Sequence, residues 1–270
     1  MERKDGEEMN KYIPIIKINF QNKLVYFWDL IGNNLFFILI MFVYLMLWKS
    51  IYADGNSSIA GITLNQMIWY LVVTEVITLS RGVIHQEVNR EVKSGEIGYL
   101  LGKPYNYIFY CFSCFIGDAG VKLLANGALA VVIGLLFVGP LEGFSLVAFP
   151  FIVISILLGW ILNFFIYMLL ALTAFWTEEN SPFFWIYSKL VFTLGGMLLP
   201  IELFPIWLQK VSKALPFVYV TYTPARLAVD FSFGAFIKGA GVQLVYLAVF
   251  ITLTLFVYGK GVRKLNVNGG

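Results

Sequence analysis

Charged residues are scarce in this sequence of 270 residues, at 13% against about 25% in soluble domains. Apolar residues make up 59%, so a soluble globule of this size would expose a largely apolar surface to water, which soluble proteins avoid. The scarcity of charge therefore excludes a soluble enzyme, a disordered chain and a nucleic-acid-binding module. The remaining class is an integral membrane protein, whose surface is solvated mainly by lipid.

Residues that bind metals or carry redox chemistry are also few. His85 is the single histidine, and Cys111 and Cys114 are the two cysteines. Their C-x-x-C spacing lies in an apolar aromatic run, where cysteine behaves as a small hydrophobic residue. A zinc site needs two further ligands, and a thioredoxin-type motif needs a soluble βαβ context. We therefore expect both cysteines to pack among apolar side chains.

A cleavable secretory signal is missing as well. Residues 1–12 are polar, and no small-residue cleavage site follows them. From Pro14, which can begin a helix, apolar and polar residues interleave as far as Trp28. Residues 1–28 are therefore predicted to form a retained cytoplasmic tail and an amphipathic helix that lies in the headgroup layer.

Long hydrophobic runs, by contrast, are plentiful. A membrane span needs about 20 residues, so the chain accommodates six spans with short loops. The predicted spans are 30–48, 62–84, 107–138, 146–176, 183–199 and 242–258. The third and fourth are longer than a hydrocarbon layer of about 30 Å requires and must tilt or kink. The predicted fold is a single all-α polytopic membrane domain over residues 1–270.

Lysine and arginine are distributed unevenly between the two sides of these spans. With the N-terminus inside, eleven lie in the inner regions and five in the outer regions. Because positive charge is retained in the cytoplasm, both termini are predicted to be cytoplasmic, with 259–270 as a basic tail. Arg81 and Lys189, at the edges of spans, are expected to reach toward the cytoplasmic surface.

Four prolines interrupt the segment 200–240 between the last two spans. It is too apolar for a free loop and too broken to cross a bilayer, so short helices that re-enter from the outside are predicted. A seventh, proline-kinked span is the alternative, and it would place the basic C-terminal tail outside. The prolines are Pro200, Pro205, Pro216 and Pro224.

The long inner loop, 85–106, has a pattern of its own. Ile84, Val88 and Val92 recur every four residues among charged neighbours, which predicts a short amphipathic helix. Gly95 is a natural stop, and a second apolar cluster follows before Pro104, made of Ile97, Tyr99, Leu100 and Leu101. Taken alone, this pattern fits either a helix resting on the inner leaflet or a docking element for a soluble partner.

The string REVKSGEIGYLLGKP in this loop resembles the cytoplasmic coupling helix of ABC-2-type ABC transporter permeases. The layout of the whole chain is similar to that family too, and the GEIxYLLxKP variant is closest to a subgroup of small bacterial permeases. The resemblance implies an exporter subunit in the bacterial inner membrane. It also implies a translocation path shared with a second permease, either the same chain or a related one, and separate ATP-binding cassette ATPase subunits.

The resemblance also implies which residues contact an ATPase. The motif residues are Glu91, Gly95, Glu96, Leu100, Leu101 and Pro104, and the neighbouring charges Glu87 and Arg90 are included because they would fix the register. The chain itself lacks a phosphate-binding loop, because GYLLGKP has the wrong spacing and ends in proline. ATP and magnesium are therefore expected on the partner chains, with no cofactor and no catalytic residue here.

Several polar residues fall within the predicted spans, where ionised groups are costly. Glu75 is expected either to line the translocation path or to make a structural hydrogen bond, and Asn33 and Asn34 to face the path or the interface. Asp118 and Lys122 are four residues apart, which favours a structural ion pair. Glu178 and Glu179 form a short inner turn that could also touch an ATPase.

Two other function classes compete with this interpretation. An ion-coupled carrier or channel could use Glu75, Asp118 and Lys122, but such proteins usually have paired broken helices in matching halves, and 200–224 has no counterpart. An intramembrane enzyme needs clustered acids or histidines, which this sequence does not have. Aromatic-rich spans suit an amphipathic cargo but are also ordinary lipid-facing surface, so the sequence leaves the substrate open.

Overall fold

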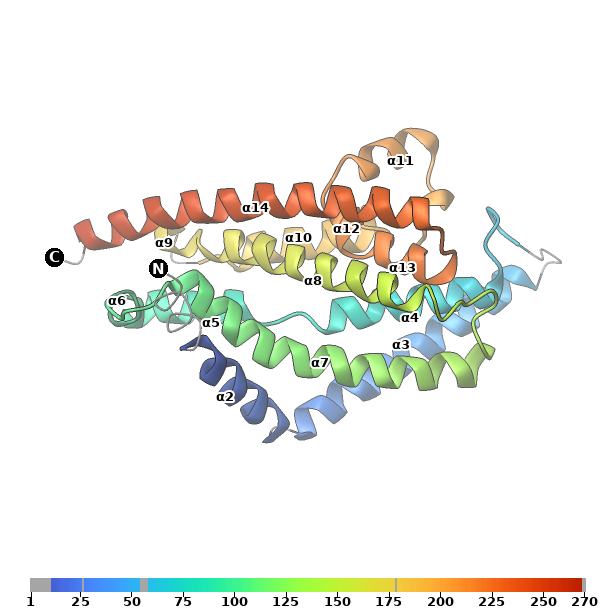
Figure 1. The fold of residues 1–270 in the computed structure, drawn as a ribbon, viewed down its shortest axis with the longest axis horizontal. Helices are drawn as coiled ribbons and strands as arrows, with labels where there is room; N and C mark the ends of the chain where they lie inside the picture. The colour runs from blue at the N-terminus through green and yellow to red at the C-terminus, as the bar shows by residue number, and fades with distance from the viewer. Residues whose placement is uncertain (1–10, 26, 54–57, 178, 269–270) are drawn as a thin grey trace.

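The computed structural model describes residues 11–25, 27–53, 58–177 and 179–268. Within these ranges the chain is α-helical and contains no β-strand (Figure 1). In chain order the elements are α2 (Tyr12–Val25), α3 (Phe27–Tyr52), α4 (Leu64–Leu79), α5 (Ile84–Lys93), α6 (Glu96–Leu101), α7 (Tyr107–Val138), α8 (Phe149–Ala171), α9 (Ala174–Thr177), α10 (Ser181–Thr193), η1 (Ile201–Leu203), α11 (Ile206–Lys213), α12 (Phe217–Val220), α13 (Tyr222–Val229) and α14 (Phe233–Asn268).

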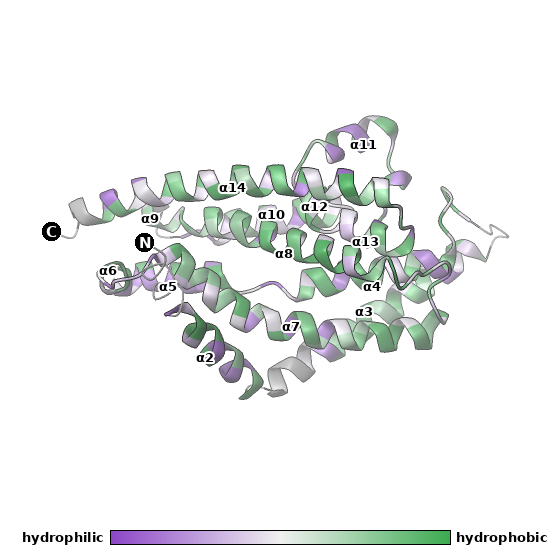
Figure 2. Ribbon diagram, viewed as in Figure 1, coloured by the Kyte–Doolittle hydropathy of each residue, from purple (hydrophilic) through white to green (hydrophobic). Residues whose placement is uncertain are grey.

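Five helical stretches in the described residues are long and apolar enough to cross a membrane. They run largely along the long axis of the molecule, and apolar residues predominate along most of their length (Figures 1 and 2). This arrangement confirms the predicted all-α polytopic fold. The stretches are Asn34–Tyr52, Leu64–Lys93, Tyr107–Val138, Phe149–Thr177 and Phe233–Leu265.

The predicted fifth span, 183–199, is shorter than expected. Helix α10 has 13 residues and ends at Thr193, so it extends about 20 Å at 1.5 Å per residue. That length is less than a hydrocarbon layer of about 30 Å. Two glycines follow, and Gly196 adopts a φ of +72° that turns the chain toward η1. A sixth crossing at this place stays a prediction.

The predicted second span, 62–84, is interrupted. Helix α4 ends at Leu79 and α5 begins at Ile84, and the bare chain between them lies beside α7 and α8 rather than at an end of the molecule (Figure 1). The Ser80 carbonyl accepts a hydrogen bond from Trp160 Nε1 at 3.1 Å, and the Ser80 hydroxyl accepts one from Asn126 at 3.0 Å. These side chains satisfy part of the backbone that the break leaves unpaired.

The predicted interfacial helix 14–28 forms over Tyr12–Val25, and Phe27 already belongs to α3. Helix α2 crosses α7 at Gly117, where an added Cβ atom would lie 2.5 Å from Cβ of Asn19 and 2.7 Å from the carbonyl oxygen of Ile16. Only a glycine permits this close approach. The helix therefore packs on α7, while its predicted place in the headgroup layer stays untested.

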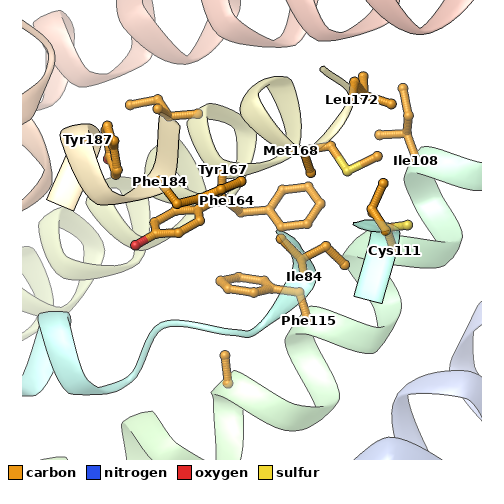
Figure 3. Close-up of a cluster of buried hydrophobic side chains, with 14 of the residues drawn as sticks. Ile84, Ile108, Cys111, Phe115, Phe164, Tyr167, Met168, Leu172, Phe184 and Tyr187 are labelled. Carbon is orange, nitrogen blue, oxygen red and sulfur yellow. The ribbon is translucent and has the colours of Figure 1, made fainter. Parts of the chain in front are cut away.

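Two large apolar clusters hold the long helices together. One joins α5, α7, α8 and α10, and Figure 3 shows Phe115, Phe164 and Tyr167 converging in it. The other joins α3, α4 and α7 around Phe37, with Ala225 and Val229 from α13. Cys111 is buried in the first cluster, as expected, and Cys114 is half-buried.

Between α10 and α14 the chain forms the short helices η1, α11, α12 and α13, of which the longest have eight residues. In Figure 1 they lie toward the end of the molecule opposite α6. None of them is long enough to span a bilayer. Short helices of this kind are what the four prolines predict, because proline interrupts a helix. Helix α14 is longer than its predicted span, 242–258, and continues through most of the predicted tail.

Candidate functional site

Helices α5 and α6 form a compact bend toward the end of the molecule at which α14 also finishes (Figure 1). Helix α5 ends at Lys93 and is capped by Ser94, and Gly95 follows with a φ of +75°, a conformation that residues with a Cβ atom rarely adopt. Helix α6 begins directly afterwards at Glu96. The helix, glycine turn and second apolar cluster therefore fold in the predicted order.

Four apolar side chains anchor this bend to the body of the protein. Ile84 and Val88 lie one turn apart on α5, and Ile97 and Leu100 lie one turn apart on α6; none is more than 4% exposed. All four belong to the cluster that contains Phe115. Because the buried face of the bend is packed against the long helices, the bend can move with them as one rigid body.

Glu91 also faces inward, although it carries a charge. It is 6% exposed and accepts a hydrogen bond from the hydroxyl of Tyr107, the first residue of α7. Leu100 is buried as well, so neither residue presents a side chain on the outside of the bend. Glu91 and Leu100 therefore cannot touch an ATPase directly, and they could affect docking only by holding α5 and α6 in position.

The other predicted contact residues are more accessible. Arg90, Gly95, Glu96 and Pro104 are exposed, and Glu87 and Leu101 are half-buried. Tyr99 is 69% exposed, and Lys103 Nζ lies 4.5 Å from the centroid of its ring. Sequence reasoning placed Tyr99 in the apolar cluster. Its position two residues after Ile97 turns it off the buried face of the helix.

A polar contact ties the bend to the turn before α10. Lys93 Nζ lies 2.5 Å from Glu179 Oε2, and the Asn89 side-chain amide donates to Glu179 Oε1 at 3.1 Å. The Lys93 hydrogen bond, followed by those from Ser181, lowers the pKa of Glu179 to about 2. Glu179 therefore joins the turn before α10 to helix α5 rather than forming only a solvated turn. Glu178, predicted beside it, lies outside the described residues.

The family described as ABC-2 family transporter protein matches residues 38–269. The chain belongs to this ABC-2 transporter family. Its members are permeases, the membrane subunits of ABC-type transporters, and the match includes the whole α5–α6 bend. No curated protein matches the chain.

Glu75 is buried in the interior of this ABC-2 permease. It is 1% exposed, Tyr44 approaches it from α3, and its Oε1 atom has no hydrogen-bond partner among the described residues. Asn34 is half-buried, and its Oδ1 atom is likewise unpartnered within that part of the chain. The side chain of Asn33 lies outside the described ones. A role for any of the three in the translocation path stays a prediction.

The charged residues of α7 in the permease form an ion pair. Lys122 Nζ lies 2.7 Å from Asp118 Oδ2, and Lys23 on α2 approaches the other oxygen of this carboxylate at 3.7 Å. The pair therefore helps to attach α2 to α7 in addition to lying along one helix.

Arg81 lies on the unwound chain between α4 and α5. Its Nη1 atom donates to the Tyr167 hydroxyl at 3.2 Å and to the Ser188 hydroxyl at 3.3 Å. These bonds turn the guanidinium toward α8 and α10, whereas the sequence predicted that it would reach for the cytoplasmic surface. Lys189, for which the same was predicted, lies 5.6 Å from the centroid of the Trp185 ring.

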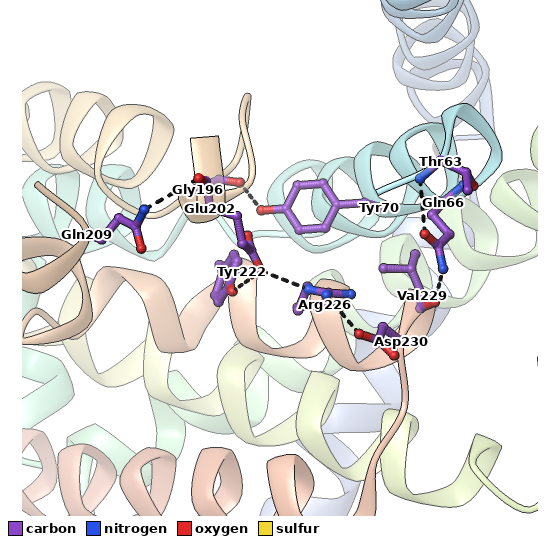
Figure 4. Close-up of polar contacts among 10 residues, drawn as sticks. All are labelled: Thr63, Gln66, Tyr70, Gly196, Glu202, Gln209, Tyr222, Arg226, Val229 and Asp230. Carbon is purple, nitrogen blue, oxygen red and sulfur yellow. Dashed lines mark hydrogen bonds and ion pairs between the residues drawn. The ribbon is translucent and has the colours of Figure 1, made fainter. Parts of the chain in front are cut away.

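The permease has a polar cluster near its other end that sequence reasoning missed (Figure 4). Arg226 Nε lies 2.8 Å from Glu202 Oε1, and the Tyr222 hydroxyl donates to the same oxygen at 2.7 Å. Arg226 also pairs with Asp230 at 2.8 Å, and the Tyr70 hydroxyl of α4 donates to the Gly196 carbonyl. The residues come from α4, η1, α13 and the turns beside them, so local spacing could have revealed only the Arg226–Asp230 pair, which is four residues apart.

Proposed function

We propose that this chain is the permease subunit of an ATP-binding cassette exporter in the bacterial inner membrane. Two permeases, either identical or related, form the translocation path, and separate ATPase subunits bind at the α5–α6 bend. Family membership supports the permease function, and the exposed surface of a rigidly anchored bend supports the docking role. The α5–α6 end is then cytoplasmic.

The bend is suited to transmit force because its two faces differ. Ile84, Val88, Ile97 and Leu100 fix one face to the cluster shared by α7, α8 and α10. The opposite face presents Arg90, Glu96 and Tyr99, which is the mixture of charge and aromatic surface that protein interfaces use. A displacement of an ATPase bound there moves the long helices together.

The coupling must act in both directions. When ATP binding brings the ATPases together, the two permeases shift between inward-open and outward-open states. A substrate that prefers one of these states must then change the affinity of the ATPases for nucleotide. ATP and magnesium bind to the ATPase chains, and the permease contributes only the mechanical link.

The experiment that tests this proposal uses the complex purified from membranes with the ATPase subunits that accompany the chain. Glu96→Arg and Tyr99→Ala change the outer face of the bend and leave its buried anchors in place. We expect both variants to weaken association with the ATPase by about tenfold or more and to reduce ATP hydrolysis by the complex. Co-purification and ATPase assays in nanodiscs measure these two effects.

A matched control reverses a charge at the far end of the molecule. Glu142 is exposed, and its carboxylate lies 3.3 Å from the Thr63 hydroxyl, so Glu142→Arg alters the surface without touching the bend. It should leave association with the ATPase unchanged. Full association of the Glu96→Arg and Tyr99→Ala variants, or an equal loss in Glu142→Arg, would count against docking at α5–α6.

A further inference from the structure

In the break between α4 and α5, one side of the chain is exposed and the other is packed against neighbouring helices. On the packed side, Ser80 bonds to Trp160 and Asn126, and a Cβ atom added at Gly82 would lie 2.7 Å from Cδ2 of Phe115. Arg81, between them, is exposed. Irregular backbone at membrane depth persists only against protein or beside a polar cavity, and broken helices often border binding sites.

Arg81 has no carboxylate partner within ion-pair distance in the part of the chain that the structure describes. Its two hydrogen-bond partners, Tyr167 and Ser188, are neutral hydroxyls at 3.2 and 3.3 Å, longer than charge-assisted bonds usually are. An exposed guanidinium beside apolar helices cannot face hydrocarbon without a large cost. Glu75 attracts Arg81 electrostatically but lies beyond ion-pair distance, so the guanidinium is still available to an anion from outside the described chain.

Apart from Arg81 itself, the side chains that line the space beside it are uncharged. A cavity of about 20 Å³, room for roughly one water molecule, lies beside it. No acidic group of the described residues lines it, and the Tyr167 hydroxyl, which accepts a hydrogen bond from Arg81, can donate its own proton to an anion. The polar residues that line the cavity with Arg81 are Thr78, Asn163, Tyr167, Tyr187 and Thr221.

Apolar surface adjoins this polar group. Trp185 lies one helical turn before Ser188 on α10 and is 66% exposed, and its neighbour Ile186 is 51% exposed. An arginine with hydroxyl donors next to an exposed aromatic side chain suits a ligand with a charged head and a hydrocarbon tail. The guanidinium donates two parallel hydrogen bonds, which match the oxygens of a carboxylate or a phosphate.

We propose that Arg81, supported by Tyr167 and Ser188, binds the anionic headgroup of an amphipathic substrate, and that its alkyl chain lies along α10. The inference rests on the proposed permease function, because it places the substrate at the break in the second span. A carboxylate and a phosphate ester share the required chemistry, whereas a quaternary ammonium headgroup does not.

The test measures direct binding to the purified permease in nanodiscs of phosphatidylcholine, without any ATPase. Three amphiphiles with the same twelve-carbon chain serve as probes: dodecyl phosphate, dodecyltrimethylammonium and dodecyl maltoside. We expect the wild type to bind dodecyl phosphate at least about tenfold more tightly than the other two, the ratio that one charge-assisted hydrogen-bond pair supplies. Quenching of tryptophan fluorescence reports the binding.

Arg81→Gln should abolish this preference, and Arg81→Lys, which keeps the charge but not the paired donors, should retain part of it. Lys189→Gln removes one positive charge from the neighbouring surface of α10 and should leave the preference intact. A thermal unfolding scan of each variant shows whether it folds. If Arg81→Gln misfolds, the comparison of Arg81→Lys with Lys189→Gln decides the question.

Two outcomes would overturn the proposal. Equal binding of the three probes by the wild type would show that the headgroup is not recognised. Loss of the permease pair in Arg81→Gln, measured by native mass spectrometry, would show that a carboxylate of the second permease occupies the site instead. Neither outcome depends on the ATPase. The proposed function is tested by a different experiment, the association assay at α5–α6, so the two proposals can fail independently.

Discussion

Short helices occur toward both ends of the long helices of this permease, and they use their polar groups differently. The α5–α6 bend is anchored by Ile84, Val88, Ile97 and Leu100, all apolar, and its charges largely point outward. The opposite segment, η1 to α13, also buries apolar residues such as Ile201 and Leu227, and adds a polar cluster in which Arg226 bonds to Glu202. One region therefore presents its polar groups to a potential partner, and the other uses them internally.

Because of this difference, the two regions should tolerate substitution of their charged residues to different degrees. Charges on the outer face of the bend can be changed with little effect on folding, because exposed polar groups contribute little to stability. A charge removed from the Glu202 cluster leaves another charge without its partner in a partly buried site. The two regions should thus respond oppositely in assays of assembly and of stability.

The largest effect is expected from Arg226→Gln. Arg226 and Glu202 are each about a quarter exposed, and Glu202 Oε2 already has no hydrogen-bond partner among the described groups. Removing the arginine should lower the free energy of unfolding by about 2–4 kcal/mol, somewhat less than for a fully buried pair. Thermal or denaturant unfolding of the purified protein in detergent measures this loss.

Asp230→Asn is the matched control for that experiment. The Asp230 side chain is 61% exposed, so its loss should cost less than about 1 kcal/mol although it also pairs with Arg226. Equal destabilisation by the two variants would contradict the assignment of the Glu202–Arg226 contact as the main polar contact of this segment.

An intermediate effect is expected from Tyr107→Phe, which tests whether the bend also depends on a buried polar contact. The change removes the hydroxyl that donates to Glu91, which is 6% exposed. An unpartnered buried carboxylate should cost about 1–3 kcal/mol. Unfolding experiments measure the loss, and Tyr99→Phe, at a ring that is 69% exposed, should change nothing.

A double variant sharpens this result. If Glu91 is replaced by Leu in the Tyr107→Phe background, no buried charge remains, and part of the lost stability should return. A double variant less stable than both single variants would show that Glu91 contributes through contacts other than the Tyr107 hydroxyl.

The smallest effect concerns the ion pair between Lys93 and Glu179, which joins the bend to the turn before α10. The pKa of Glu179 is lowered from 4.5 to about 2, so its contribution is present above pH 4.5 and is lost as the pH falls toward 2. The wild type and Glu179→Gln should differ by a small constant amount from pH 7 to pH 5 and converge only in stronger acid.

Thermal unfolding of both proteins over this pH range measures the difference. Because the Glu179 side chain is exposed, the offset should shrink in high salt as well. Convergence of the two curves already near pH 6 would mean that Lys93 does not hold the Glu179 carboxylate in its ionised form.

The sequence predicted the α5–α6 bend well because its signals are local. Apolar residues four apart define the buried face of α5, and Gly95 occupies the one position that needs a positive φ. Tyr99 and Glu91 were harder to place, since the direction of each side chain depends on what α6 and α5 pack against. The inward turn of Glu91 requires the Tyr107 hydroxyl, which belongs to the next long helix.

Hydrophobicity over long runs determined by itself that this chain is an all-α membrane protein, because lipid tolerates little else. Proline spacing likewise determined that the segment before α14 is a set of short helices. Only the tertiary structure decided that the second predicted span breaks at Arg81 and that Glu202 meets Arg226. Both depend on side chains from elements distant in sequence, such as Trp160 at Ser80, which supply hydrogen bonds that neither the helix nor lipid can provide.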